Sequence, residues 1–278
     1  MPEGDSVFRA AAELHQALAG QRLTSADLRV PAYATAQLTG RQVLEVRPRG
    51  KHLLARLEGG LTLHTHLGME GRWRVYAAGE RWTGGAGHQI RAVLGTAERT
   101  AVGYRLRVVE LLRTADESRA VGHLGPDLLD GAWDDALAAE AVRRLLAAPA
   151  RPVGEALLDQ RNLAGIGNVY ANELSFMAGV TPWAPVAELA APHKVVALAH
   201  RLLLANRMRS GHPTTGQLRP DLAHWVYGRA GRPCRRCGAR IRTASQGVPP
   251  QQRVAYWCPR CQRGVGPDGR PSGTPTLP

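Results

Sequence analysis

The stretch CRRCGARIRTASQGVPPQQRVAYWCPRC, residues 234–261, contains all four cysteines of this 278-residue chain. The cysteines form two CxxC pairs, Cys234 with Cys237 and Cys258 with Cys261, and 20 residues separate the pairs. Each pair can present two thiolates to one ion, and two such turns complete a tetrahedral shell of sulfur. The spacing predicts one structural zinc ion; two disulfides or buried free thiols are the alternatives.

Three arginines, Arg240, Arg242 and Arg253, lie between the two CxxC pairs. A small zinc-bound hairpin with arginines is suited to enter a nucleic-acid groove; a zinc ribbon in a protein–protein contact is the alternative. The whole chain has 36 Lys and Arg against 23 Asp and Glu, a formal net charge of +13. This excess favours a polyanionic partner, because each neutralised phosphate releases counterions. A merely soluble, arginine-rich protein is the other interpretation.

Helical patterns precede the cysteine-rich stretch. The segment Asp130–Ala148 contains WDDALAAEAVRRLLAA, with acids in its first turn and arginines later, which complements a helix dipole. Further helices are expected at residues 153–160, 168–178 and 192–209, with Gly179, Pro192 and Gly211 suited to their ends. The Gly-Ile-Gly of residues 165–167 is not expected to bind a dinucleotide, because no third glycine follows at Tyr170.

The first half of the chain is dominated by strand patterns. A first helix is predicted with Asp5 or Ser6 as its cap and Gly20 at its end. Short strands then follow with turn signals between them, at residues 43–49, 52–58, 61–67, 72–77 and 105–112. Closely spaced strands without long helices between them indicate an antiparallel sandwich or barrel.

These patterns divide the chain into an N-terminal β-sandwich with a leading helix (1–115), a linker (116–130), a helical domain (131–225) and a zinc finger (226–263). The fold class is therefore expected to be α+β. The tail from 264 to 278 is rich in Gly, Pro, Ser and Thr, and is expected to be disordered. No apolar run reaches the roughly 18 residues that cross a bilayer, and the N-terminus lacks a secretion-signal layout. A cytoplasmic protein is expected.

The first residues, Met1-Pro2-Glu3, can carry chemistry. Removal of Met1 would leave Pro2 as a free secondary amine, whereas retention of Met1 makes it an unreactive tertiary amide. A secondary amine can attack the C1′ carbon of a sugar, and the resulting iminium acidifies the C2′ proton, so that the 3′ phosphate can be eliminated. Glu3 could act as the general acid. An ordinary lead-in to a helix is the alternative.

Several fragments together resemble the formamidopyrimidine-DNA glycosylase/endonuclease VIII family over nearly all of residues 1–263. The fragments are MPEG at the start, RGKHLL at 49–54, HLGMEGRWRV at 66–75, HLGPDLL at 123–129, LLDQRNLAGIGNVYANE at 157–173 and QQRVAYWCPRCQ at 251–262. The resemblance implies a β-sandwich followed by a helix-two-turn-helix domain with the zinc finger. It further implies that Pro2 is the Schiff-base nucleophile and Glu3 the general acid.

The resemblance also implies roles for residues outside the N-terminus. Lys51 would act in β-elimination and hold the phosphate of the lesion, a solvated turn lysine being the alternative. Asn168 would grip a phosphate at a helix start, and Arg253 would bind the phosphate beside the lesion and assist δ-elimination. Met69 would fill the gap left by the flipped nucleotide; a core methionine is the alternative. His64 and His66 share one strand face and are expected to pack or to form hydrogen bonds.

Two departures from the family pattern bear on the substrate. Asp5-Ser6 stands where family members often carry Pro-Glu, and the Arg-Phe-Gly wedge of the formamidopyrimidine branch is missing. The stretch AVGYRLRVVELL at 101–112 is more similar to the endonuclease VIII branch. We therefore expect a DNA glycosylase with AP-lyase activity that acts on oxidised pyrimidines, with β- and optionally δ-elimination.

Two other functions remain open: an 8-oxoguanine/formamidopyrimidine glycosylase, and a non-catalytic protein that binds damaged DNA. The expected partner is damaged double-stranded DNA, bound by a monomer in the bacterial cytoplasm. No membrane and no nucleotide cofactor are expected, and zinc is the one metal.

Overall fold

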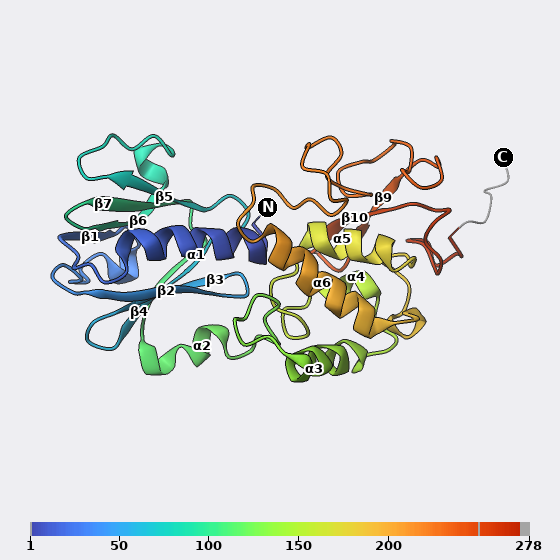
Figure 1. Ribbon diagram of the computed structural model, residues 1–278, viewed down its shortest axis with the longest axis horizontal. Helices are drawn as coiled ribbons and strands as arrows, with labels where there is room; N and C mark the ends of the chain where they lie inside the picture. Colours follow the sequence, from blue (N-terminus) through green and yellow to red (C-terminus); the bar gives the residue numbers. More distant parts are fainter. Residues whose placement is uncertain (1, 250, 273–278) are drawn as a thin grey trace. The chain divides into compact units, whose positions relative to one another are not determined.

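The structure is a computed structural model that describes residues 2–249 and 251–272. It separates into two compact units, Met1–His123 and Leu124–Pro278 (Figure 1). Each unit has a hydrophobic core of its own, and each is treated separately below. Within the described residues, no helix is long and apolar enough to cross a membrane.

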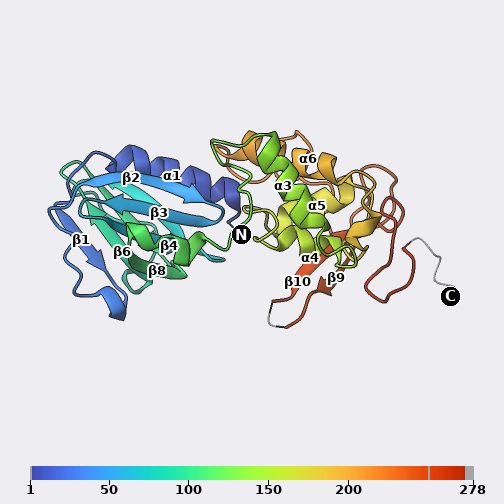
Figure 2. The ribbon, with the colours of Figure 1, turned by 90° about the horizontal axis from the view of Figure 1, so that it is seen from below.

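The first unit is a pair of four-stranded antiparallel sheets with one long helix, α1 (Gly4–Leu18) (Figure 2). One sheet has the order β1-β6-β7-β5, with bounds Ser25–Leu28, Ile90–Gly95, Arg99–Tyr104 and Arg72–Ala77. The other has the order β2-β3-β4-β8, with bounds Val43–Arg49, His52–Leu57, Leu61–His66 and Val108–Arg113. Apolar side chains from both sheets and from α1 form one core, as in a β-sandwich with a leading helix.

Helix α1 begins earlier than expected. Glu3 occupies the N-cap position without a side-chain capping bond, so the expectation that Asp5 or Ser6 caps the helix is wrong. Asp5 lies in the first turn, where an acid complements the helix dipole, and it is buried. The helix ends at Leu18, and Gly20 follows with φ of 78°, a conformation that suits glycine.

The observed strands have the expected bounds where polar and apolar residues alternate along the sequence. The expected strands at 43–49 and 72–77 are β2 and β5 as observed. Strand β8 begins only at Val108, because Arg105 adopts φ of 49° and turns the chain first. The edge strand β1 is short and polar, and β6 is buried on both faces, so neither shows the alternation that identifies a half-buried strand.

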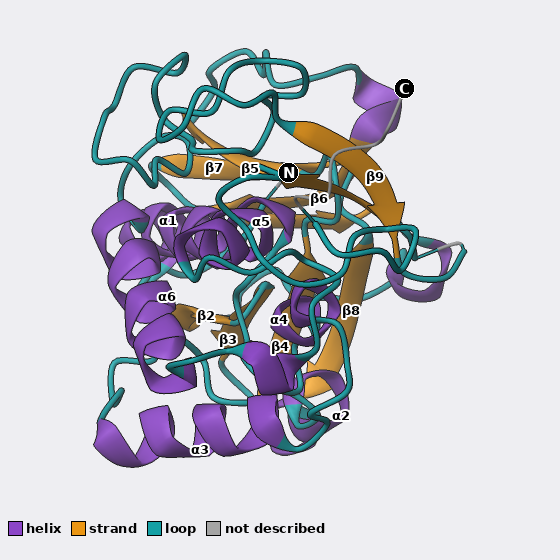
Figure 3. Ribbon diagram, turned by 90° about the vertical axis from the view of Figure 1, so that its right-hand side faces the viewer, coloured by secondary structure: helices purple, strands orange, loops and turns teal. Residues whose placement is uncertain are grey.

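The first unit ends with two short helices, η3 (Thr114–Asp116) and α2 (Ser118–Val121), and α2 lies within the segment expected to be a linker. The second unit contains α3 (Asp135–Leu146), α4 (Val153–Leu158), α5 (Asn168–Met177) and α6 (Pro192–Asn206) (Figure 3). A hairpin of β9 (Arg242–Gln246) and β10 (Arg253–Trp257) follows. Single 3-10 turns occur at Pro31–Tyr33, Gly87–Gln89 and Val186–Glu188.

Helix ends follow local capping chemistry. Helix α3 starts at Asp135 and not near Asp130, because the Asp134 carboxylate accepts the Leu137 amide at 2.8 Å. The expectation of disorder from residue 264 is wrong for residues 264–272. There the chain folds back, with a bridge between Val265 and Pro271 and a bond from Thr181 Oγ1 to the Val265 carbonyl. Residues 273–278 lie outside the described residues.

Candidate active site and metal centre

One end of the first unit collects several of the predicted site residues. The strand registers place Arg49, His52, His66 and Val108 in one row of the second sheet, and Arg72, Tyr104 and Ile90 in one row of the first. The connections that leave these rows are the β2–β3 turn, the β4–β5 loop and the β7–β8 turn. The start of α1 lies beside the β2–β3 turn in two perpendicular views (Figures 1 and 2).

Pro2 is half-buried and directly precedes α1, and Glu3 is fully buried at the N-cap position. The backbone carbonyl of Glu3 accepts the Val7 amide at 3.0 Å, which fixes the first helical turn. Removal of Met1 would leave a Pro2 amine at the positive end of the helix dipole, which disfavours an ammonium ion there. A buried carboxyl group next to it is suited to general acid catalysis.

Lys51 lies half-buried in the β2–β3 turn, close to two histidines. Burial is the main cause that lowers the pKa of His52 to about 3 and that of His66 to about 4, and the Lys51 charge lowers both further. Both imidazoles are therefore neutral at physiological pH. Lys51 is thus a cation close to two neutral rings, and the Arg107 charge also acts on His66.

A chain of hydrogen bonds sets the tautomers of these histidines. Glu110 Oε2 lies 3.1 Å from His64 Nδ1, so this nitrogen donates its proton to the carboxylate. His64 Nε2 is then an acceptor and receives the Nδ1–H of His52 at 2.8 Å. His66 Nδ1 accepts the Gly68 amide at 3.0 Å. The expectation that His64 and His66 form hydrogen bonds is confirmed.

Met69 is 56% exposed in the β4–β5 loop, so the alternative of a core methionine does not hold. The loop is closed by the Gly71 amide, which donates to the Leu67 carbonyl at 2.9 Å. A Cβ atom at Gly71 would lie 2.1 Å from that carbonyl oxygen, so only glycine fits. Glu70 accepts Arg105 Nη1 at 2.5 Å and joins this loop to the β7–β8 turn.

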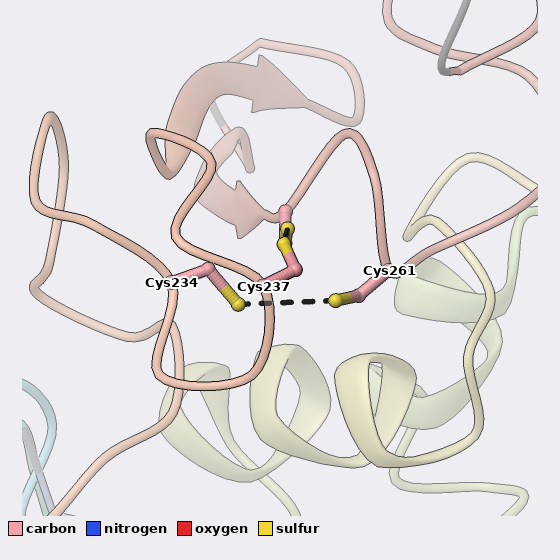
Figure 4. Close-up of side chains that lie close together, drawn as sticks. Cys234, Cys237 and Cys261 are labelled. Atoms are coloured by element: carbon pink, nitrogen blue, oxygen red, sulfur yellow. Dashed lines mark hydrogen bonds between the residues drawn. The ribbon is translucent and has the colours of Figure 1, made fainter.

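The four cysteines of the second unit converge on one point (Figure 4). All four Sγ atoms lie within 4.8 Å of one another, with Cys234 to Cys261 at 3.9 Å and Cys237 to Cys258 at 3.4 Å. A disulfide needs about 2.05 Å, whereas a tetrahedral zinc site with bonds of about 2.3 Å spaces its sulfurs about 3.8 Å apart. The donor set therefore fits zinc and excludes the disulfide alternative.

Asn168 contacts the zinc-finger hairpin at the residue that follows Arg253. Asn168 is the first residue of α5, is buried, and donates its Nδ2–H to the Val254 carbonyl of β10 at 3.0 Å. Arg253 is exposed at the start of β10, and its guanidinium donates to the Gln252 carbonyl at 2.8 Å. Asn168 thus braces the hairpin against α5, and the Arg253 charge faces solvent at the hairpin turn.

A further carboxylate, which the sequence reasoning missed, organises the segment before the finger. Glu173 is fully buried in α5 and accepts the backbone amides of Trp225, Val226 and Tyr227, each at 2.8 Å. The Thr214 hydroxyl donates to the same carboxylate. A charged residue within the otherwise apolar and amide-bearing run NVYANELSFM was the signal that could have identified it.

Models of three protein families match the chain. The formamidopyrimidine-DNA glycosylase N-terminal domain matches residues 1–116, and the formamidopyrimidine-DNA glycosylase H2TH domain matches residues 124–209. The zinc finger found in FPG and IleRS matches residues 231–264.

The chain is similar to several whole proteins. A probable endonuclease 8 2 of Streptomyces coelicolor is 60% identical over 98% of this chain and 97% of its own length. The DNA-(apurinic or apyrimidinic site) lyase Nei2 of Mycolicibacterium smegmatis is 50% identical over 94% of this chain and 99% of its own length. Among solved structures, Lactococcus lactis Fpg with abasic-site DNA aligns with a TM-score of 0.77 at 23% identity. That alignment covers 94% of this chain and 99% of the other, and it supports the fold alone.

Proposed function

This chain belongs to the formamidopyrimidine-DNA glycosylase/endonuclease VIII family of bifunctional DNA glycosylases and AP lyases, and we propose that it removes oxidised pyrimidines through an imine on Pro2. The four cysteines hold one structural zinc ion, whose closed sulfur shell leaves no position for activating water. The similarity to endonuclease 8 proteins and the missing Arg-Phe-Gly wedge support the choice of pyrimidines.

The observation that carries the mechanism is the position of Pro2 beside a fully buried Glu3 at the head of α1, next to the β2–β3 turn that holds Lys51. The neutral Pro2 amine attacks C1′ of the damaged nucleotide, the bond from C1′ to the base breaks, and the base leaves with the proton that the Pro2 nitrogen loses. Glu3 protonates the sugar ring oxygen as the bond from C1′ to that oxygen breaks, which leaves an iminium between Pro2 and C1′. The iminium acidifies the C2′–H bond, and the Glu3 carboxylate takes that proton. The C3′–O bond to the phosphate breaks in the same elimination, and Lys51 stabilises the departing negative charge.

Residues of both units are proposed to contact the DNA. Met69 is exposed on a loop whose shape Gly71 and its hydrogen bond to Leu67 define, which suits a wedge into a base stack. In the second unit, the Arg253 guanidinium and the start of α5 at Asn168 are proposed to bind phosphates.

Borohydride trapping tests this proposal. Duplexes with an oxidised pyrimidine, 8-oxoguanine or an abasic site are incubated with the protein after mass spectrometry has shown that Met1 is removed. We expect covalent protein–DNA on the pyrimidine and abasic duplexes, loss of that product when an additional residue precedes Pro2, and a fall of about a hundredfold or more in Pro2→Ala. Pro31→Ala, which removes an exposed proline from the 3-10 turn at Pro31–Tyr33, serves as the matched control.

Other outcomes of the same experiment decide between the alternatives. Trapping on 8-oxoguanine in place of the pyrimidine would assign the formamidopyrimidine substrate class. Retained DNA binding without trapping on any duplex would identify a non-catalytic DNA-binding protein.

A further inference from the structure

A shallow hollow of about 330 Å³ lies on the first unit. Its lining is basic and polar: His88, Gln89, Arg91, Arg105 and Leu106. His88 and Gln89 precede β6, Arg91 is its second residue, and Arg105 and Leu106 form the β7–β8 turn. The hollow therefore sits at the end of the sandwich that also carries the Met69 loop.

The backbone is irregular on both sides of this hollow. In the β6–β7 ladder Ile90 pairs with Tyr104 and Ala92 with Gly103, so Arg91 is the extra residue of a β-bulge. Bulges redirect a side chain at the expense of ladder pairing. On the other side, Arg105 is the one non-glycine residue with positive φ, 49°, in the described part of the chain. L-residues other than glycine adopt this conformation only at an energetic cost.

The Arg91 side chain carries an unsatisfied donor. Its Nε atom is buried and lacks a hydrogen-bond partner within residues 2–249 and 251–272. A buried donor without an acceptor is costly, and natural structures keep few of them. Arg105 has two partners: its backbone amide donates to the Gln89 carbonyl at 2.7 Å, and its guanidinium pairs with Glu70.

From these features we infer that His88, Arg91 and Arg105 form a subsite for a DNA backbone phosphate beside the Met69 loop. Arg91 lines the hollow, and the terminal nitrogens of its planar guanidinium supply donors that match phosphate oxygens. Arg105 can exchange Glu70 for the phosphate, so that Glu70 holds the arginine in place before DNA arrives. This subsite rests on the proposed function, which provides the DNA.

The test measures equilibrium binding of the full chain to a duplex with a tetrahydrofuran abasic analogue over a series of salt concentrations. In Arg91→Gln we expect weaker binding, and a slope of log K against log salt that is smaller by about 0.9, the value for one lost phosphate contact. Arg99→Gln removes the same charge from the same sheet outside the hollow and should leave the slope near that of the wild type. Equal slopes in the wild type and in Arg91→Gln would overturn the subsite.

A second pair of variants changes affinity in the opposite direction. Glu70→Gln releases Arg105 and is expected to strengthen binding more than Glu80→Gln, which removes an exposed carboxylate elsewhere. Thermal unfolding of the free protein separates binding from folding. Arg91→Gln should keep or raise the melting temperature, because no intramolecular bond is lost; a large fall would show a structural arginine and overturn the inference.

Two further readouts identify the source of the phosphate and separate this inference from the enzymatic proposal. A rise in melting temperature with inorganic phosphate that Arg91→Gln abolishes, without a change in the DNA slope, would show a free-anion site and refute a DNA subsite. A smaller salt slope in Arg91→Gln, together with no borohydride trapping by the wild type, would support the subsite and refute the enzymatic proposal. Borohydride trapping by the wild type, with equal salt slopes for the wild type and Arg91→Gln, would support the enzymatic proposal and refute the subsite.

Discussion

At the scale of single residues, the neutral histidines beside Lys51 make the stability of the first unit depend on pH. The folded-state pKa values of His52 and His66 are about 3 and about 4, and both lie below the ordinary value of 6.5. Above pH 6.5 both rings are neutral whether the chain is folded or unfolded. As the pH falls below 6.5, the unfolded chain takes up protons that the folded protein excludes, so stability is lost down to about pH 4 for His66 and about pH 3 for His52.

We therefore predict that His52→Gln flattens this dependence. At pH 5 the linkage amounts to about 2 kcal/mol for one such imidazole. The difference in unfolding free energy between pH 7.5 and pH 5.0, measured by urea denaturation, should be smaller by about that amount in the variant. His200→Gln, in the second unit, is the control. An unchanged difference in His52→Gln would mean that this ring is accessible to protons in the folded state.

Residues differ in how far the sequence predicts them. The cysteine ligands are predictable because each CxxC turn is local and its chemistry follows from spacing alone. The roles of Pro2 and Glu3 are predicted from the chemistry of a free N-terminal amine and from the family motifs, and that of Lys51 from the family motifs alone. The His52–His64–Glu110 chain was not, because it requires the register of three strands, and His64 and Glu110 are 46 positions apart. The Arg91 bulge likewise follows from pairing with β7 and has no local sequence signature.

At the scale of elements, helix α5 connects the helical core to the zinc finger. Its residues 168–176 are all buried, because α4, α6 and β10 pack around it. Asn172 Oδ1 accepts the Tyr256 amide of β10 at 2.6 Å, and Glu173 accepts three amides of the segment before the finger. Periodicity predicted the helix within one residue of each end, but it could not indicate which polar side chains point inward.

Glu173 provides a stability test at this scale. We predict that Glu173→Ala destabilises the protein by about 4 kcal/mol, since three buried amides lose their acceptor at about 1–3 kcal/mol each. Glu173→Gln should cost less, because its carbonyl oxygen can still accept the Val226 and Tyr227 amides. Ser175→Ala, which removes one buried hydroxyl from the same helix, should cost only about 1 kcal/mol. Equal losses in all three variants, measured by urea denaturation, would contradict this role.

At the scale of the whole molecule, two separate cores predict that damage to one unit leaves the other folded. The fold class, the order of the segments and the zinc finger could be anticipated from sequence, because each depends on local patterns. The short strands β1 and β6 could not, since edge and fully buried strands lack the alternating pattern. The zinc-site cysteines also belong to a smaller hydrophobic cluster, which contains Phe176 of α5 and Val226 and so links the finger to α5.

Zinc removal tests this independence. Structural zinc contributes folding free energy on the order of 10 kcal/mol, and its sulfurs pack against Phe176 at the end of α5. We predict that chelation speeds amide hydrogen exchange in residues 225–263 and in the last turns of α5, measured by mass spectrometry. Strands β3 and β4 should keep their protection, because their core contains no residue of the finger. If chelation exposes β3 and β4 equally, the two units unfold as one, and the separate cores do not act independently.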